Sequence, residues 1–431
     1  MKVGSTRGGA AALPLADALL GGTAPDGGLY VPAEFPPRMG RGPRGGTLAD
    51  SALAMLSPFF AEDRLSVALP VMVAEAFTFP APLVPLRNRG DFVVELFHGP
   101  TAAFKDFGAR FLAACMRRLD PRDDGTRTVL VATSGDTGGA VAAAFHRMSG
   151  VRVVLLYPDG RVSPRQEHQL GAFADNVTAL RVAGSFDDCQ RLVKQAFADT
   201  ELRVCTPLSS ANSISLGRLL PQLAFHAHAA WSSGGTLNLV VPTGNLGNAV
   251  AALWARQLGA PIGDIVLATN ANRTLPEFFE GGAYRGRPSV QTLANAMDVG
   301  DPSNFERLAW TYPDPALLRA RIRARSVSDE HISRTIQQGE RRHGRVFCPH
   351  TAAGVWVLEQ IRVESGTRAG TWAVAATAHP AKFESIVEPL VGHPVEVPPA
   401  LAELLGRPAR SEPMAADPAA LRRWLLDHAE G

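Results

Sequence analysis

The chain has 431 residues, a hydrophobic content of 46% and a formal net charge of +2. This length predicts two or three domains with sizeable cores. The near-neutral charge, without any block of like charge, argues against a nucleic-acid-binding protein and against docking on an anionic membrane surface.

Cysteine usage predicts a cytoplasmic protein with reduced thiols. The four cysteines show no paired spacing of the kind that metal ligands have, so no metal site is expected; they are Cys115, Cys189, Cys205 and Cys348. No apolar run is long enough to span a bilayer. Pro14 and Asp17 interrupt the apolar stretch near the N-terminus, so a signal peptide is not expected.

The first 88 residues are the least regular part of the sequence. A short helix is predicted over 13–20, and passages rich in glycine and proline follow it. A second helix is predicted over 47–60, because Thr47 can cap it and Asp50 stands at the capping-box position. We expect a loop-rich N-terminal domain over residues 1–88.

From residue 92 onward, apolar strand-like runs alternate with helical patterns. Such alternation is typical of parallel strands joined by right-handed crossovers, which is an α/β fold. Capping signals predict helices that start near Ser163 and Ser185, and a last helix that starts at Asp417. The predicted strands are 92–97, 128–133, 151–157, 177–182, 236–241, 265–268 and 371–377. The other predicted helices are 102–118, 140–148, 213–231, 249–258 and 326–341; the rest of 281–350 gives no clear pattern.

Lysine is rare in this chain, since the 43 basic residues include only Lys2, Lys105, Lys194 and Lys382. Among basic side chains, lysine can lose its proton inside a protein and attack a carbonyl, whereas arginine cannot. Lys105 stands in the first turn of the helix predicted over 102–118. There the helix dipole and the neighbouring Phe104 and Phe107 favour a neutral amine. We predict a nucleophilic Lys105; the alternative is a lysine on a solvated helix face.

Two glycine-rich loops connect a predicted strand to a predicted helix. They are Ser-Gly-Asp-Thr-Gly-Gly at 134–139 and Thr-Gly-Asn-Leu-Gly-Asn at 243–248. Glycine lets an anion approach the backbone N–H groups at the helix start, although a tight turn alone explains either loop. Neither has the Rossmann fingerprint. Together with Lys105 they suit pyridoxal phosphate, which needs an amine, a phosphate pocket and a partner for its ring nitrogen. Thr377 is the candidate partner.

The motifs follow one another in the order of a known family. The sequence resembles the threonine synthase family, within the fold-type-II pyridoxal-phosphate enzymes, over nearly its full length. The N-terminal motif and the lysine motif are together specific, whereas Gly-Asn loops occur across the whole superfamily. The motifs that carry the resemblance lie at 5–8 and 24–32, 98–106, 134–138, 212–214, 242–245 and 377–383.

The resemblance implies a fold and a cofactor. It implies an α/β fold of type II, with two parallel-sheet subdomains over 89–400, the cofactor between them, an N-terminal domain over 1–88 and a helical tail over 401–431. It also implies that Lys105 holds pyridoxal 5'-phosphate as a Schiff base. The implied cofactor contacts are Gly244, Asn245, Leu246, Gly247 and Asn248 for the phosphate and Thr377 for the ring nitrogen. The implied substrate contacts are Thr101, Ser134, Gly135, Asp136, Thr137, Asn212, Ser213 and Arg218.

The implied reaction converts O-phospho-L-homoserine and water to L-threonine and phosphate. Lys105 would be the base that takes the α-proton. The leaving phosphate needs cations or N–H donors, and Arg110 and Arg218 are the candidates. Asp106 and Asp136 are expected to fix loops, His98 and His379 to shape turns, and Lys382 to be structural. No nucleic-acid or membrane partner is expected, and both a monomer and a homodimer remain open.

Three alternatives remain at this point. A related phospholyase would keep the same cofactor residues but would eliminate phosphate without forming threonine. A serine or threonine dehydratase of fold type II is disfavoured by the N-terminal motif. A non-catalytic protein that has kept the fold to bind a small molecule is disfavoured by the retention of Lys105 in a lysine-poor chain.

Overall fold

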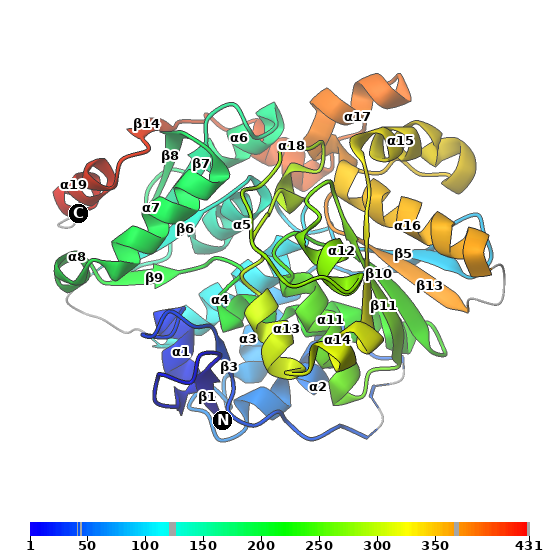
Figure 1. The fold of residues 1–431 in the computed structure, drawn as a ribbon. Coiled ribbons are helices and arrows are strands. Elements are labelled where there is room, and N and C mark those ends of the chain that lie inside the picture. The colour runs from blue at the N-terminus through cyan, green and yellow to red at the C-terminus, as the bar shows by residue number, and fades with distance from the viewer. Residues whose placement is uncertain (41, 44, 120–125, 366–369, 429–431) are drawn as a thin grey trace.

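The computed structural model describes residues 1–40, 42–43, 45–119, 126–365 and 370–428. Two sheets stand side by side, and a smaller N-terminal unit lies below them (Figure 1). Every neighbouring pair in the two sheets is parallel except β4 with β5. The six-stranded sheet has the order β12 (Ile322–Ser326), β11 (Ile262–Thr269), β10 (Leu237–Pro242), β13 (Thr371–Ala376), β5 (Asp91–Glu95), β4 (Leu83–Pro85). The five-stranded sheet has the order β14 (Glu412–Ala415), β8 (Val177–Ala183), β7 (Val151–Pro158), β6 (Arg127–Ala132), β9 (Leu208–Ser210).

Both faces of the central strands of the six-stranded sheet are buried, which explains why β10 and β13 are almost continuously apolar rather than alternating. Leu239 and Val241 of β10 point to one core, which α10 (Gln222–Ser232) and α11 (Gly247–Leu258) complete. Val240, between them, points to the other core. The helices of that second core are α15 (Asp329–His343), α16 (Pro349–Ser365) and α17 (Glu384–Val391).

The five-stranded sheet is covered in the same way. Val129 and Val131 of β6 pack with α4 (Lys105–Leu119), α5 (Asp136–Phe145) and α6 (Pro164–Gly171). Leu130 faces the opposite core, together with α7 (Phe186–Ala198) and α19 (Pro418–Asp427). Successive residues of β6 therefore belong to two separate hydrophobic cores, one on each face of the sheet.

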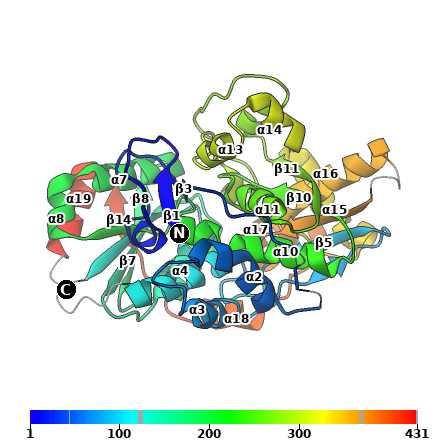
Figure 2. The same ribbon diagram turned by 90° about the horizontal axis from the view of Figure 1, so that it is seen from below.

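The N-terminal unit combines a small antiparallel sheet with three helices. The sheet has the order β2 (Leu13–Pro14), β1 (Lys2–Ser5), β3 (Tyr30–Pro32), and the helices are α1 (Leu15–Gly21), α2 (Leu48–Phe60) and α3 (Leu69–Ala76). Seen from below, α2 and α3 lie against α10 and α4 (Figure 2). Apolar residues of this unit belong to the same core as α10 and α11. The unit is therefore packed onto the α/β region rather than tethered to it.

Several local predictions are confirmed and others are wrong. The capping boxes of Thr47 and Ser185 form as expected, and α19 begins after its Asp417 cap. The helix predicted from residue 140 starts at Asp136, so residues 136–139 of the first glycine loop are helical. The tail predicted as helical contains the strand β14. The division into 1–88, 89–400 and 401–431 stays a prediction.

The sequence left several shorter elements unassigned. Four of them lie between residues 270 and 350, where short helices and turns replace the regular alternation. They are α8 (Thr200–Cys205), α12 (Thr274–Phe279), η1 (Asn295–Met297), α13 (Phe305–Thr311), α14 (Pro315–Arg321), η3 (Pro380–Phe383) and α18 (Pro399–Leu405). The helix predicted over 213–231 is divided into α9 (Leu216–Leu219) and α10. No helix in the described part of the chain is long and apolar enough to cross a membrane.

Candidate active site

A small cavity of about 40 Å³ lies where loops from both sheets meet. Its lining includes Lys105, residues 132–134 and 136–137 from the end of β6 and the start of α5, and Asn245, which follows β10. Asn212 and Ser213, which follow β9, and Gln190 of α7 add to the polar lining, whereas the predicted contact Gly135 does not line the cavity. The carboxyl ends of parallel strands are where α/β proteins bind ligands. The structure therefore brings most of the predicted site segments into one place.

Lys105 is the first residue of α4, as its predicted position in the first helical turn requires. The pKa of its amine is lowered to about 8, first by burial and then by the positive charge of Arg218, with Asp136 partly offsetting both. Its Nζ lies 4.6 Å from the centre of the Phe104 ring. A substantial fraction of the Lys105 amine is therefore neutral near pH 8. Only the neutral amine can act as a nucleophile or a proton acceptor.

Thr377 lies beside the segment that carries Lys105. It directly follows β13, its side chain is buried, and its carbonyl accepts a hydrogen bond of 2.8 Å from the Phe104 N–H. The neighbouring Ala378 forms an isolated β-bridge with Ala103. These contacts join two segments that are more than 270 positions apart in the chain. The role of Thr377 toward a ring nitrogen stays a prediction.

The loop 243–248, the first cradle, has the backbone geometry of an anion-binding loop, and its residue Asn245 lines the small cavity. Leu246 adopts a left-handed conformation with φ of 64°, and α11 starts at the next residue, so the N–H groups of its first turn are directed at the loop. Gly244 is required because a Cβ there would lie 2.8 Å from the Met297 Cα. The backbone at Gly244 thus packs against the backbone of Met297 more closely than any side chain would allow.

Asn248 adds a side-chain donor to this cradle. Its Oδ1 accepts a hydrogen bond of 2.6 Å from His226 Nε2. Burial lowers the pKa of His226 to about 4, although its bonds to Asn248 oppose this, so the imidazole is neutral at pH 7. Asn248 Nδ2 is buried and has no partner among the described residues. A phosphate group at this helix N-terminus would supply the hydrogen-bond acceptor that the buried Asn248 Nδ2 lacks.

The start of α5 forms the second cradle. Thr133 Oγ1 accepts hydrogen bonds from the N–H groups of Gly135 and Gly138, at 3.0 and 2.8 Å. Gly135 has φ of 125°, and a Cβ there would lie 2.6 Å from Gln166 Nε2, so glycine is needed for two reasons. Ser134 and Thr137 line the cavity. The helix N-terminus can hold an anion here as well.

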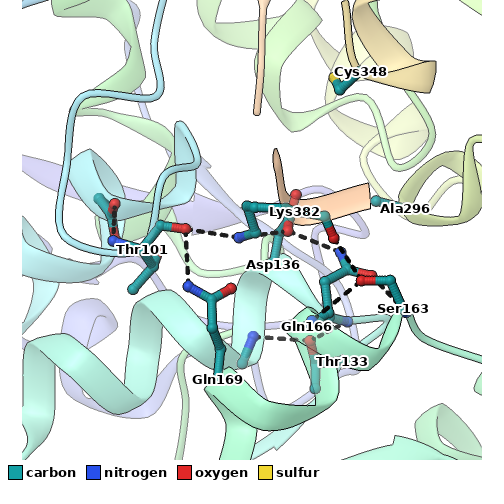
Figure 3. Close-up of polar contacts among 12 residues, drawn as sticks. Thr101, Thr133, Asp136, Ser163, Gln166, Gln169, Ala296, Cys348 and Lys382 are labelled. Carbon is teal, nitrogen blue, oxygen red and sulfur yellow. Dashed lines mark hydrogen bonds and ion pairs between the residues drawn. The ribbon is translucent and has the colours of Figure 1, made fainter. Parts of the chain in front are cut away.

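The carboxylate of Asp136 is held by two neighbouring side chains. Its Oδ1 lies 2.8 Å from Lys382 Nζ and accepts a hydrogen bond of 2.9 Å from Gln166 Nε2 (Figure 3). Burial opposes ionisation, yet the charge of Lys382 holds the pKa of Asp136 below its usual value. Lys382 also donates to the Thr101 carbonyl at 2.7 Å. The geometry agrees with the predicted loop-fixing role of Asp136.

Thr101 does not line the cavity, although it is a predicted substrate contact. Its hydroxyl donates to Asp106 Oδ1 at 2.7 Å and its N–H donates to Asp106 Oδ2 at 2.9 Å. Both residues are fully buried. Burial raises the pKa of Asp106, which these two bonds oppose. This pair fixes the turn that precedes Lys105.

Asn212 and Ser213 form one wall of the cavity. Asn212 Nδ2 donates to the Ala132 carbonyl at 3.2 Å, and Ser213 Oγ accepts from Asn245 Nδ2 at 2.7 Å. These bonds tie the loop after β9 to β6 and to the first cradle. A larger cavity of about 810 Å³ shares Asn212 and Asn245 with the site and extends toward the N-terminal unit.

The two arginines predicted to serve a leaving anion are placed very differently. Arg218 is 1% exposed and donates to the Ala211 carbonyl, and its Nε has no partner among the described residues. Arg110 donates instead to the Glu75 and Ala76 carbonyls, at 2.6 and 3.3 Å, at the end of α3. Arg218 therefore stays a candidate, whereas Arg110 is engaged outside the cavity.

Sequence reasoning missed a buried arginine that supports the site. Arg307 donates to Asn304 Oδ1 at 2.6 Å, to the Ile214 carbonyl at 2.7 Å and twice to the Tyr30 carbonyl. Asn304 in turn donates to the Asn245 carbonyl at 2.9 Å. Burial lowers the pKa of Arg307 to about 9, with Glu306 partly offsetting this. This set, the Arg307 bridge, links the first cradle to the N-terminal unit. No sequence pattern reveals it, because Tyr30 and Ile214 are far from Arg307 in the chain.

The substitution Arg307→Met is expected to destabilise the protein by about 3 kcal/mol, because it leaves several buried acceptors without donors. The midpoint of urea unfolding would measure this. Arg323→Met, which removes an exposed ion pair with Asp264, is the control and should not shift the midpoint. Equal midpoints for the two variants would contradict a structural role for the Arg307 bridge.

Comparisons with known proteins agree on one family. The model of the pyridoxal-phosphate dependent enzymes matches residues 76–377, that of the threonine synthase N terminus matches 2–77, and that of the threonine synthase C-terminal region matches 351–425. The threonine synthase of Haemophilus influenzae is 41% identical over 363 residues, with 83% of each chain covered.

Solved structures extend the likeness to the whole fold. The crystal structure of threonine synthase from Escherichia coli has a TM-score of 0.91 at 35% identity and covers 99% of this chain and 100% of its own. A threonine synthase from Brucella melitensis, solved with pyridoxal phosphate bound, has a TM-score of 0.89 at 36% identity and covers all of both chains.

Proposed function

Because this chain belongs to the threonine synthase family of pyridoxal-phosphate-dependent lyases, we propose how its residues convert O-phospho-L-homoserine and water to L-threonine and phosphate. The observation that carries this assignment of roles is one lysine, Lys105, set at a cavity between two helix N-termini. The phospholyase left open by the sequence gains no support, since the relatives described above are threonine synthases.

The cofactor site is assigned to the first cradle. Pyridoxal phosphate, when bound, supplies an aldehyde for the Lys105 amine and a ring that delocalises negative charge from the substrate. Residues 244–248 would hold its phosphate with backbone N–H groups, and Asn248 Nδ2 would add a side-chain donor. Thr377 would hydrogen-bond the ring nitrogen.

The substrate site is assigned to the second cradle and its neighbours. The loop 134–137 would hold the carboxylate or the phosphate of the substrate, and Asn212 and Ser213 would contact it from the facing wall. Lys105 takes the α-proton, which its lowered pKa permits near neutral pH. Arg218 offers positive charge as negative charge builds on the leaving phosphate. The larger adjoining cavity is the entry route.

The same proposal extends to the setting of the enzyme. We place it in the cytoplasm, in keeping with four free cysteines. It would act on a small molecule alone, without a nucleic-acid or membrane partner, as a monomer or a homodimer.

The test uses purified protein with O-phospho-L-homoserine. Phosphate release and threonine formation are measured in the same sample, and equal amounts of the two are expected. Phosphate accompanied by a keto acid in place of threonine would contradict the proposal and would indicate a phospholyase.

The lowered pKa of Lys105 has a pH-dependent consequence for the apoprotein. Only the neutral amine attacks an aldehyde, and its fraction rises with pH up to the pKa of about 8. Uptake of added pyridoxal phosphate, followed by absorbance, should therefore accelerate by about tenfold per pH unit below 8 and level off above it. A midpoint near 10.5, the ordinary value for lysine, would show that the site does not perturb this amine.

A further inference from the structure

The second cradle contains a negative charge where an anion is expected to bind. Asp136 is the first residue of α5 and is 4% exposed, so its carboxylate lies buried at the helix N-terminus. Asp136 also lines the cavity. An ionised carboxylate in a poorly solvated place repels a second anion strongly. The cradle therefore needs a fixed positive charge before it can accept the substrate.

Lys382 supplies that charge. Its side chain is completely buried, and its Nζ lies 2.8 Å from Asp136 Oδ1 (Figure 3). The backbone around Lys382 is fixed as well, because its carbonyl accepts a hydrogen bond of 2.5 Å from Ser163 Oγ. The lysine thus reaches the cradle from η3, an element that contributes no residue to the cavity lining.

The other charged groups nearby do not replace Lys382. Lys105 is partly neutral near pH 8, and Arg218 donates to the Ala211 carbonyl rather than to Asp136. His350 is buried, and burial lowers its pKa to about 4, so its imidazole is neutral. Within the described residues, Lys382 is the cation in direct contact with Asp136.

We propose that Lys382 is a positioning residue that neutralises Asp136 and so keeps the N-terminus of α5 receptive to an anionic group of the substrate. This inference rests on the proposed function, which assigns the substrate to that cradle. It goes beyond a structural role, because it predicts opposite effects on substrate affinity when the two partners of the pair are changed separately.

The experiment compares Lys382→Met with Asp136→Asn. Methionine keeps much of the lysine volume but leaves the carboxylate unpaired, so binding of O-phospho-L-homoserine should weaken by at least about tenfold. Asparagine keeps an oxygen that accepts hydrogen bonds from Lys382 and Gln166 but removes the negative charge. That variant should bind the substrate as tightly as the native protein or more tightly. The double variant should recover most of the affinity that Lys382→Met loses.

A merely structural pair would behave differently, since both single variants would then weaken binding alike; that result would overturn the proposal. Asp91→Asn is the matched control, because Asp91 is 2% exposed and pairs with Arg362 at 2.5 Å at the amino end of β5. It removes a buried carboxylate of similar kind and should leave KM unchanged. Thermal melting and the absorbance of bound cofactor show that each variant is folded and loaded.

Two probes identify the anionic group. L-Threonine carries the carboxylate alone, and inorganic phosphate stands for the other anion. Weaker binding of L-threonine to Lys382→Met assigns the cradle to the carboxylate, weaker inhibition by phosphate assigns it to the phosphate, and an effect on neither overturns the proposal. A native protein that forms no threonine would refute the proposed function, whereas an active native protein with unchanged affinity in Lys382→Met refutes this inference alone.

Discussion

Lys105→Ala is expected to abolish both phosphate release and threonine formation, by at least about 10⁴-fold, which is the upper end of what a positioned acid–base group contributes. The reason is that one amine both holds the cofactor and takes the α-proton. The geometry supports this double use, since Lys105 is the lysine that lines the cavity. Steady-state rates with O-phospho-L-homoserine, measured for both products, would show the loss.

The control for this experiment is Lys2→Ala, which removes an exposed lysine of β1 and should keep the native rate. Lys105→Ala should also stay colourless when pyridoxal phosphate is added and the excess is removed. A yellow, active Lys105→Ala protein would show that another lysine is the nucleophile. The buried Lys382 would then be the alternative, because it is the other lysine near the site.

Arg218→Met is expected to lower kcat by about 10²- to 10³-fold, the range seen when one preorganised donor to a developing anion is removed. Arg218 is buried, its Nε has no partner among the described residues, and its charge lowers the pKa of Lys105. Loss of that charge should also raise the pKa of Lys105. Because Lys105 is a free amine only in the substrate complex, the pH profile of kcat should therefore shift to higher pH on its acidic limb.

The variant Arg110→Met is the control. It tests whether the loss in Arg218→Met comes from the role of Arg218 toward the leaving phosphate or from the removal of any nearby positive charge. Arg110 lies on the same helix as Lys105 but donates to carbonyls at the end of α3, so its removal should leave kcat within about twofold. A large loss in Arg110→Met together with a small loss in Arg218→Met would reverse the assignment of the two arginines.

The sequence predicted those parts of the fold that local rules determine. Strands buried on both faces appear as continuous apolar runs, and caps such as Thr47 and Ser185 mark helix starts through a single side chain. The start of α5 was misplaced because its four residues Asp-Thr-Gly-Gly have poor helix propensity, and tertiary contacts overrode it. β14 was missed because a short edge strand with a proline gives almost no pattern.

The candidate site was predictable only where a chemical requirement selects a residue type. Lys105 stood out because lysine is rare here, and the two cradles stood out through glycine. Arg307 had no such signal, since its partners Tyr30 and Ile214 are 277 and 93 positions away. Lys382 was predicted to be structural, but its pairing with Asp136 depends on how η3 meets α5, which no local pattern encodes.

The position of β13 in the six-stranded sheet has a consequence for folding during synthesis on the ribosome. β13 lies between β10 and β5, although it is built from residues 371–376. Until those residues emerge, the nascent sheet is divided, and the segment of Lys105 lacks the Thr377 carbonyl that fixes it. Domains generally fold as units during synthesis, the N-terminal ones first, so the five-stranded half can assemble early apart from its late edge strand. The contact between the Lys105 segment and Thr377 therefore forms only after residue 377 has been synthesised, and a shorter nascent chain lacks a complete cofactor pocket.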